Sequence, residues 1–208
     1  MRFPRGPALA AAALAALGAG ATAPAFQETP LKGLGFDRGD QAAPLQVIEF
    51  GDLGCSACAQ FAVETLPAIG AEFIQTGRVR WKFVPFVLGA FRNSKQATAA
   101  AVCAGEQDAF WPTHDLLYQQ QKRWSSARDP DTILRSLVLE AGVDSSRFER
   151  CYRDRATTTQ ISQFTRLAKR FSVNATPTFF VGERRVRGAL PPALFRQVLL
   201  EAGEPARP

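Results

Sequence analysis

The chain has 208 residues, of which 46% are hydrophobic and 21% are charged, the composition of an ordinary globular protein. Its length suits one hydrophobic core with room for an insertion. The formal net charge is +6, but the basic residues are scattered, and no basic stretch is interleaved with aromatic residues as nucleic-acid binding would require. The densest basic group, residues 182–188 (GERRVRG), is interpreted as a solvated hairpin. We therefore expect no nucleic-acid partner.

Residues 1–25 have the pattern of a cleavable secretory signal. They begin with two arginines and no acid, continue with an apolar run, and end in the small-residue sequence Ala-Pro-Ala. The run is shorter than the roughly 20 residues that span a bilayer, so a permanent membrane anchor is the less favoured interpretation. We expect cleavage before Phe26 and export to the periplasm or another extracytoplasmic compartment. Residues 26–44 are rich in Gly, Pro and polar residues, which predicts a loosely held lead-in.

The first regular elements surround a pair of cysteines. Residues 45–50 (LQVIEF) predict a strand that two glycines end. Residues 59–77 have apolar residues at helical spacing, which predicts a helix bent at its proline and closed by its last glycine. Residues 78–87 (RVRWKFVPFV) predict a second strand. Cys55 and Cys58 therefore lie at the strand-to-helix corner of a βαβ unit, which is typical of a thioredoxin-like redox site.

Disulfide exchange explains why this pair belongs at a helix N-terminus. A free cysteine ionises only near pH 8.5, and unpaired backbone N–H groups together with the helix dipole stabilise its thiolate. Cys55, just outside the helix, is predicted to be the exposed nucleophile, and Cys58, one turn in, to resolve the mixed disulfide. A passive staple is disfavoured because so small a loop constrains little unfolded chain. A four-ligand zinc site is a less favoured alternative, because the other two cysteines do not form a second C-x-x-C.

Residues 91–171 have helix-compatible spacing throughout and contain Cys103 and Cys151. These two cysteines could be buried free thiols, but the even cysteine count of an exported protein favours a structural disulfide between them. The single histidine, His114, lies in the helical pattern FWPTHDLLY, where packing or capping is favoured over metal binding. We expect no metal site and no cofactor.

After this helical region, residues 178–181 predict another strand, which Pro177 precedes. A proline at a strand start needs no ladder N–H, and an X-Pro bond is the only kind in which a cis peptide is accessible at low cost. From the residues alone, a cis and a trans Thr176–Pro177 bond remain equally open.

Four stretches together resemble the DsbA-like thiol–disulfide oxidoreductases of the thioredoxin superfamily. The run VIEFGDLGCSACAQF resembles the active-site strand and helix of that family, and VRWKFVPFVL resembles its second strand. AAAVCAGEQDAFWPTHDLLYQQQ resembles its inserted helical domain, and FSVNATPTFFVGERRVRGALPPALFRQVLLEA its closing strand, hairpin and helix. The resemblance implies an α/β thioredoxin-like fold with an inserted helical domain. The expected organisation is a signal at 1–25, a lead-in at 26–44, a thioredoxin-like domain at 45–90 and 172–205, and an insertion at 91–171.

The resemblance also implies roles for three further residues. It implies that Pro177 is cis beside the C-x-x-C, and that Thr176 offers backbone groups to an extended substrate. It places Glu49 beneath the active-site disulfide, where an acid would accept or relay the proton of Cys58. Burial in a central strand should raise the pKa of Glu49, although a carboxylate pointing to solvent at the strand end is the alternative.

The activity that follows from this resemblance is dithiol–disulfide exchange at Cys55 and Cys58, most simply the introduction of disulfides into exported client proteins. The strongly oxidising family members have Pro-His between the cysteines; Ser56-Ala57 here should stabilise the thiolate less. A reductase or isomerase role therefore stays open, as does a copper-binding chaperone. We expect cysteine-containing clients, a membrane redox partner that resets the site, and a monomer, because the lead-in leaves no room for a dimerisation domain.

Overall fold

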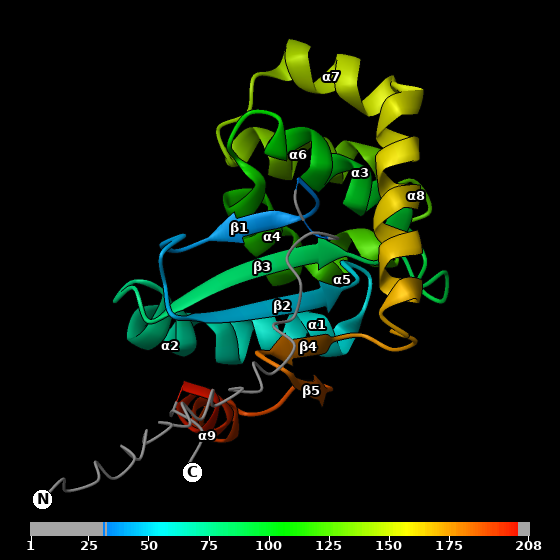
Figure 1. Cartoon of the computed structure of the whole chain (residues 1–208). Coiled ribbons are helices and arrows are strands. Elements are labelled where there is room, and N and C mark those ends of the chain that lie inside the picture. The colour runs from blue at the N-terminus through cyan, green and yellow to red at the C-terminus, as the bar shows by residue number, and fades with distance from the viewer. Residues whose placement is uncertain (1–30, 32, 204–208) are drawn as a thin grey trace, which may run out of the picture.

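A computed structural model describes residues 31 and 33–203, so the predicted signal segment lies outside the described residues. Its centre is a five-stranded sheet with the strand order β1-β3-β2-β4-β5 (Figure 1). The strands are β1 (Phe36–Arg38), β2 (Leu45–Gly51), β3 (Val79–Pro85), β4 (Thr178–Val181) and β5 (Arg184–Arg187). The mixed α/β thioredoxin-like architecture that the sequence predicts is confirmed.

The central strand β2 carries the chain into the cysteine pair. It is parallel to β3 on one side and antiparallel to β4 on the other. Six of its seven residues are buried, which is the near-continuous apolar pattern of a strand covered on both faces. The strand ends at Gly51, four residues before Cys55, so its carboxyl end places Cys55 next to the core.

The helical segment between β2 and β3 is interrupted rather than regular. It consists of α1 (Ser56–Gln60), η2 (Phe61–Thr65), α2 (Leu66–Ile69) and η3 (Gly70–Ile74), in which η2 and η3 are π-helical turns. Pro67 has no N–H to donate, so the regular hydrogen-bond ladder cannot continue through it, and the Leu66 N–H instead reaches back to the Phe61 carbonyl. Gly77, at φ +72°, follows the end of the segment as the sequence predicts.

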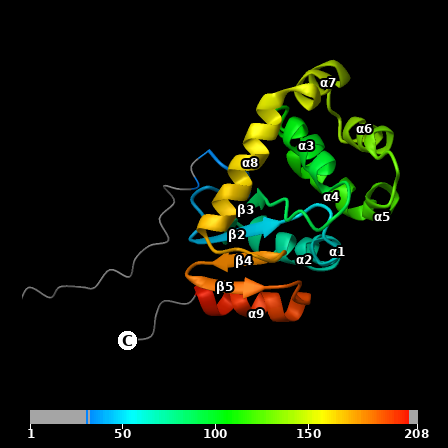
Figure 2. The ribbon, with the colours of Figure 1, turned by 90° about the vertical axis from the view of Figure 1, so that its right-hand side faces the viewer.

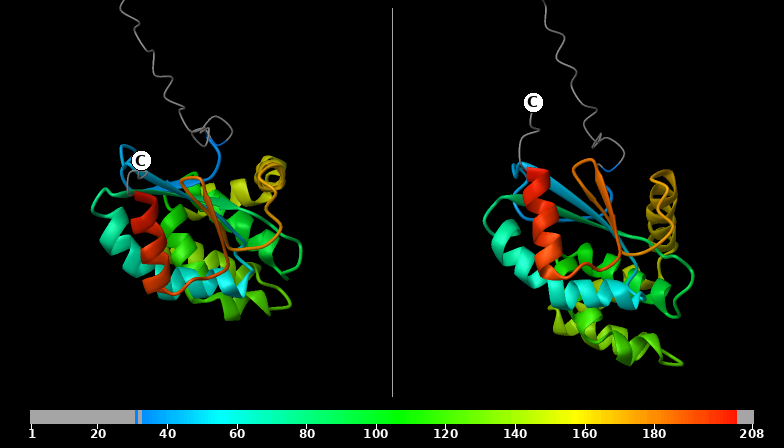
Figure 3. Two further views of the ribbon diagram at one scale, coloured as in Figure 1. Left: turned by 60° about the horizontal axis from the view of Figure 1, so that its bottom comes forward. Right: turned by 90° about the horizontal axis from the view of Figure 1, so that it is seen from below.

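Helices cover the two faces of the sheet with different partners. The helical segment after β2 and α9 (Pro192–Gly203) pack on the face that carries Val47 and Trp81, and Figure 3 shows these helices side by side. The opposite face, with Ile48 and Phe180, packs against α8. Alternate residues of β2 therefore enter different cores.

Six helices are inserted between β3 and β4, as the resemblance implies (Figure 2). They are α3 (Ser94–Gly105), α4 (Phe110–Gln119), α5 (Gln121–Ser125), α6 (Asp131–Glu140), α7 (Ser145–Arg153) and α8 (Arg155–Arg170). The two helices α7 and α8 are separated by Asp154 alone, whose backbone is extended at φ −76° and ψ 137°.

The prediction of a loosely held lead-in is wrong for its described part. Residues 36–38 form β1, which pairs antiparallel with β3. Phe36 stacks on Phe110 of α4 with ring centroids 3.6 Å apart, and the Trp111 indole donates to the Asp37 carbonyl at 2.7 Å. Aromatic packing against the insertion holds this edge strand in place, and such a contact leaves no local signal in a three-residue strand.

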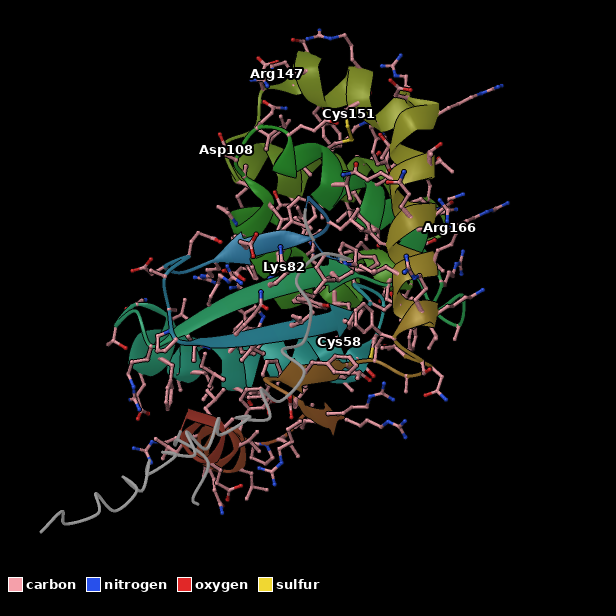
Figure 4. All side chains as sticks on the ribbon, in the orientation of Figure 1. Cys58, Lys82, Asp108, Arg147, Cys151 and Arg166 are labelled. Carbon is pink, nitrogen blue, oxygen red and sulfur yellow. A yellow bond between two sulfur atoms is a disulfide. The ribbon has the colours of Figure 1, made fainter. Side chains whose placement is uncertain are left out.

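Cys103 and Cys151 are joined by a disulfide that links α3 to α7. Figure 4 shows Cys151 beside α7 at the top of the view and Cys58 well below it beside the central sheet, so the two pairs of cysteines form separate sites. Within residues 33–203, no helix is both long and apolar enough to cross a membrane.

Candidate active site at the end of the central strand

The loop between β2 and α1 presents Cys55 as the N-cap of α1. Its backbone is extended at φ −77° and ψ 122°, and its sulfur accepts a hydrogen bond from the Cys58 N–H at 3.3 Å. Both cysteines are free thiols in this structure. The sulfur therefore lies at the positive end of the helical segment, as the spacing predicts.

The prediction that Cys55 is exposed is wrong, because the residue is only 3% exposed and Cys58 is fully buried. Neighbouring chain segments cover Cys55. Its Sγ lies 3.4 Å from the Thr176 carbonyl oxygen, and the insertion contacts the loop from the other side.

The two thiols differ in acidity. The Cys58 thiol, donating to the Cys55 sulfur, lowers the pKa of Cys55 to about 6, with burial opposing this and further help from the Thr176 side chain and the N–H groups of Cys58 and Ala57. Burial raises the pKa of Cys58 well above its usual range, as do its hydrogen bond to Cys55 and the nearby charges of Cys55 and Glu49. One sulfur is thus prepared to react as a thiolate and the other to hold a proton.

Glu49 is buried in β2, 1% exposed, so the alternative of a solvent-facing carboxylate is excluded. The Trp81 Nε1–H donates to its Oε2 at 3.0 Å, while Oε1 has no hydrogen-bond partner among the described residues. Burial raises the pKa of Glu49 to about 8, against the lowering effect of the Trp81 bond, and the negative charge of Cys55 contributes to the rise. The carboxyl group is therefore protonated at neutral pH. Its pKa is close enough to neutral pH for the group to release and take back a proton there.

The segment before β4 completes the site. The Thr176–Pro177 peptide bond is cis. The Thr178 hydroxyl donates to the Ala175 carbonyl at 2.8 Å, and the Gly188 N–H donates to the Pro177 carbonyl at 2.9 Å. The structure thus brings Cys55, the proline loop and the start of β4 together from positions more than a hundred residues apart.

Sequence reasoning missed Asp52. This buried carboxylate accepts hydrogen bonds from the Gly54 and Leu88 N–H groups and from the Ser94 hydroxyl. Burial raises its pKa, and these hydrogen bonds oppose the rise. The sequence Asp-Leu-Gly carries a readable signal for the local Asx turn, but nothing local indicates Leu88 or Ser94.

His114 packs in the core, as its helical pattern predicts. It is fully buried, with its ring in edge contact with Phe83 and Tyr118, and its Nδ1 lies 2.8 Å from the Asp115 carboxylate. No cluster of three or more His, Cys, Asp or Glu side chains suited to a metal ion occurs in the described part of the chain.

Comparison with known proteins agrees with this arrangement. Residues 34–201 match the family model described as thioredoxin. The chain is 30% identical over 146 residues to a probable disulfide bond formation protein D of Bacillus cereus, covering 69% of this chain and 68% of that protein.

Two solved structures share the fold. Oxidised BdbD from Bacillus subtilis superposes with a TM-score of 0.73 at 23% identity, covering 83% of this chain and 94% of that one. The α-DsbA1 of Wolbachia pipientis gives a TM-score of 0.72 at 20% identity, covering 80% and 89%. The chain belongs to the DsbA-like family of thioredoxin-fold thiol:disulfide oxidoreductases.

Proposed function

We propose that this oxidoreductase introduces disulfides into exported proteins, with Cys55 and Cys58 as its redox pair. The observation that carries the proposal is the position of the Cys55 sulfur at the N-terminus of α1, where it accepts a hydrogen bond from the Cys58 N–H at 3.3 Å, and the lowered pKa of Cys55 agrees with it. A stabilised thiolate stabilises the reduced enzyme, which makes the disulfide form a better oxidant. The lowered pKa of Cys55 therefore supports a role as an oxidant despite Ser56-Ala57.

The reaction proceeds in two exchanges. A client thiolate attacks Cys55 Sγ of the Cys55–Cys58 disulfide, the S–S bond breaks, and Cys58 leaves as a thiolate that takes the proton of Glu49. A second client thiolate then attacks the client sulfur of the mixed disulfide and releases Cys55 as a thiolate. The client loses two electrons, the enzyme gains them as a Cys55 thiolate and a Cys58 thiol, and Glu49 takes a proton back from solvent.

The segment around Thr176 and Pro177 has the role of docking an extended client strand beside Cys55. The support for this role is the 3.4 Å separation of the Cys55 sulfur from the Thr176 carbonyl. Main-chain pairing of this kind accepts many sequences, which suits an enzyme with varied clients.

The remaining parts of the proposal follow from the sequence. The segment at 1–25 directs export, and the enzyme works outside the cytoplasm as a monomer on cysteine-containing clients. A membrane redox partner takes the two electrons and restores the disulfide. A copper-binding role gains no support, because the single histidine is buried in the insertion among aromatic rings.

The deciding experiment measures the redox state of the Cys55–Cys58 pair in its native compartment by rapid acid quench and thiol labelling. A mostly oxidised pair is expected, because a donor must hold the disulfide it transfers. The Cys103–Cys151 disulfide is an internal control that the quench preserves disulfides. A mostly reduced pair would contradict the oxidase and favour the reductase or isomerase.

A further inference from the structure

The helical insertion holds the active-site loop through polar side chains from three of its helices. Ser94 of α3 donates to the Asp52 carboxylate, and the Tyr118 hydroxyl of α4 donates to the Asp52 carbonyl at 3.2 Å. Gln121, the first residue of α5, contacts the loop closest to the reactive sulfur. Figure 2 shows α4 and α5 next to α1.

The Gln121 side chain reaches the backbone on both sides of Gly54. Its Nε2 lies 2.6 Å from the Leu53 carbonyl oxygen and 3.0 Å from the Cys55 carbonyl oxygen. Gln121 is only 8% exposed, so these hydrogen bonds face little competition from water. A glutamine amide carries two N–H donors, and the two carbonyl groups use both of them.

Gly54 lets the loop approach the insertion closely enough for these bonds. A Cβ at this position would lie 2.6 Å from the Phe91 Cβ and 2.9 Å from the Ser94 Cβ, which no side chain could tolerate without a shift of its neighbours. The loop and the insertion are therefore in backbone-level contact at Gly54, and Gln121 adds a polar link at the same point.

This link bears on the chemistry because the Cys55 carbonyl belongs to the residue that carries the reactive sulfur. The orientation of that peptide unit decides whether Sγ faces the Cys58 N–H, 3.3 Å away, and the Thr176 segment. In addition, the Nε2–H groups offset the negative ends of two carbonyl dipoles near the sulfur, which lowers the cost of placing a thiolate there.

We propose that Gln121 is a positioning residue of the exchange reaction, through which the helical insertion sets the reactivity of Cys55. The proposal rests on the assignment of Cys55 as the sulfur that exchanges with the client, and it is independent of the direction of electron flow. Gln121 acts through its hydrogen bonds to the Leu53 and Cys55 carbonyls.

The test measures alkylation of the reduced full-length protein by iodoacetamide from pH 4 to 9 in the unmodified chain and in Gln121→Met. Methionine keeps the length of the side chain and removes both donors. We expect the rate at pH 4 to 5, below the midpoint, to fall by about three- to tenfold, the range of one net hydrogen bond, with the midpoint of the pH profile moved upward. The matched control is Gln119→Met, because Gln119 is exposed two residues earlier in the same glutamine run, and its profile should match that of the unmodified protein.

A merely structural role for Gln121 would lower the thermal unfolding midpoint and leave the pH profile in place, which would overturn the proposal. If Gln121→Met does not fold, Gln121→Glu replaces it: the buried carboxyl, protonated at acidic pH, donates one hydrogen bond in place of two, and a smaller fall in rate is expected. An unchanged rate in that variant would also overturn the proposal. An ordinary, unactivated thiol in the unmodified chain would overturn the assignment of Cys55 and this inference with it, whereas an activated Cys55 unaffected by Gln121→Met would overturn the inference alone.

Discussion

The indole of Trp81 donates a 3.0 Å hydrogen bond to the carboxyl group of Glu49. Both residues are buried, and they lie on the adjacent parallel strands β3 and β2. The bond reaches Oε2 only, and Oε1 has no hydrogen-bond partner within the described residues. One donor does not replace the hydration of a carboxylate, so the group is held in its neutral form to unusually high pH. Glu49 is consequently a destabilising group at physiological pH, and its raised pKa suits the proton-carrying role proposed for it.

The first prediction is that Glu49→Gln stabilises the fold at neutral pH. The pKa of this carboxyl is about 8 in the folded state and 4.5 in its ordinary state. Between these values the unfolded chain has released the proton that the folded chain still binds, so the free energy of unfolding falls as pH rises. Glutamine does not titrate, so the variant should gain up to about 3 kcal/mol at pH 7 and little below pH 4. Urea unfolding of the reduced proteins at several pH values checks this, and a gain that does not change with pH would contradict it.

The second prediction concerns the rate of exchange. Glu49→Gln should slow exchange at Cys58 by roughly tenfold to hundredfold, because an amide cannot give or take the proton of the leaving sulfur. Stopped-flow measurement between pH 6 and 8 checks this. Glu64→Gln serves as the control, because it removes an exposed carboxylate from the helical segment that contains Cys58. Equal rates for Glu49→Gln and the unmodified enzyme across that range would rule out the proton-relay role.

The third prediction concerns the buried hydroxyl of Thr176, which has no hydrogen-bond partner among the described residues. A Cys55 thiol donates to the Thr176 carbonyl, whereas a Cys55 thiolate can only accept a hydrogen bond. The Thr176 hydroxyl is then the donor on this side of the sulfur, which is why the Thr176 side chain lowers the pKa of Cys55. Thr176→Val should therefore raise that pKa from about 6 by up to about one unit. Ultraviolet absorbance of the thiolate, titrated with pH in the reduced protein, measures the shift. The same substitution at exposed Thr158 should leave the titration in place, and a midpoint unmoved in Thr176→Val would show that the hydroxyl plays no part.

The fourth prediction assigns the two sulfurs. Cys58→Ser should accumulate mixed disulfides through Cys55 with clients that carry a disulfide, because the Cys55 thiolate attacks the client S–S bond and the serine cannot displace the client from Cys55. Cys55→Ser should trap none, since the pKa of the Cys58 thiol is raised well above its usual range and Cys58 forms little thiolate. Non-reducing gel electrophoresis after acid quench detects the complexes. Trapping through Cys58 in the Cys55→Ser variant would reverse the assignment.

Local sequence determined much of this protein. The apolar runs of β2 and β3, the glycines at and just after the end of β2 and the C-x-x-C spacing fix a strand, a corner and a helix start with little help from distant residues, because each depends on the local apolar pattern or on backbone freedom. Pro67 likewise determines that the helical segment after β2 is interrupted, because its missing N–H does not depend on any distant residue.

Tertiary contacts decided the rest. The burial of Glu49 depends on which helices cover its face of the sheet, so the sequence left two alternatives open and only packing chose between them. The stacking of Phe36 on Phe110 holds β1 in place, and the pattern of a three-residue strand cannot predict this long-range contact. Gln119 and Gln121 are equivalent in the sequence, and only the docking of α5 against the active-site loop buries one and leaves the other in solvent. The acidity of Cys55 follows from the same cause: a helix start can be read from the chain, but the hydrogen bonds and the burial around the sulfur come from segments that folding brings together.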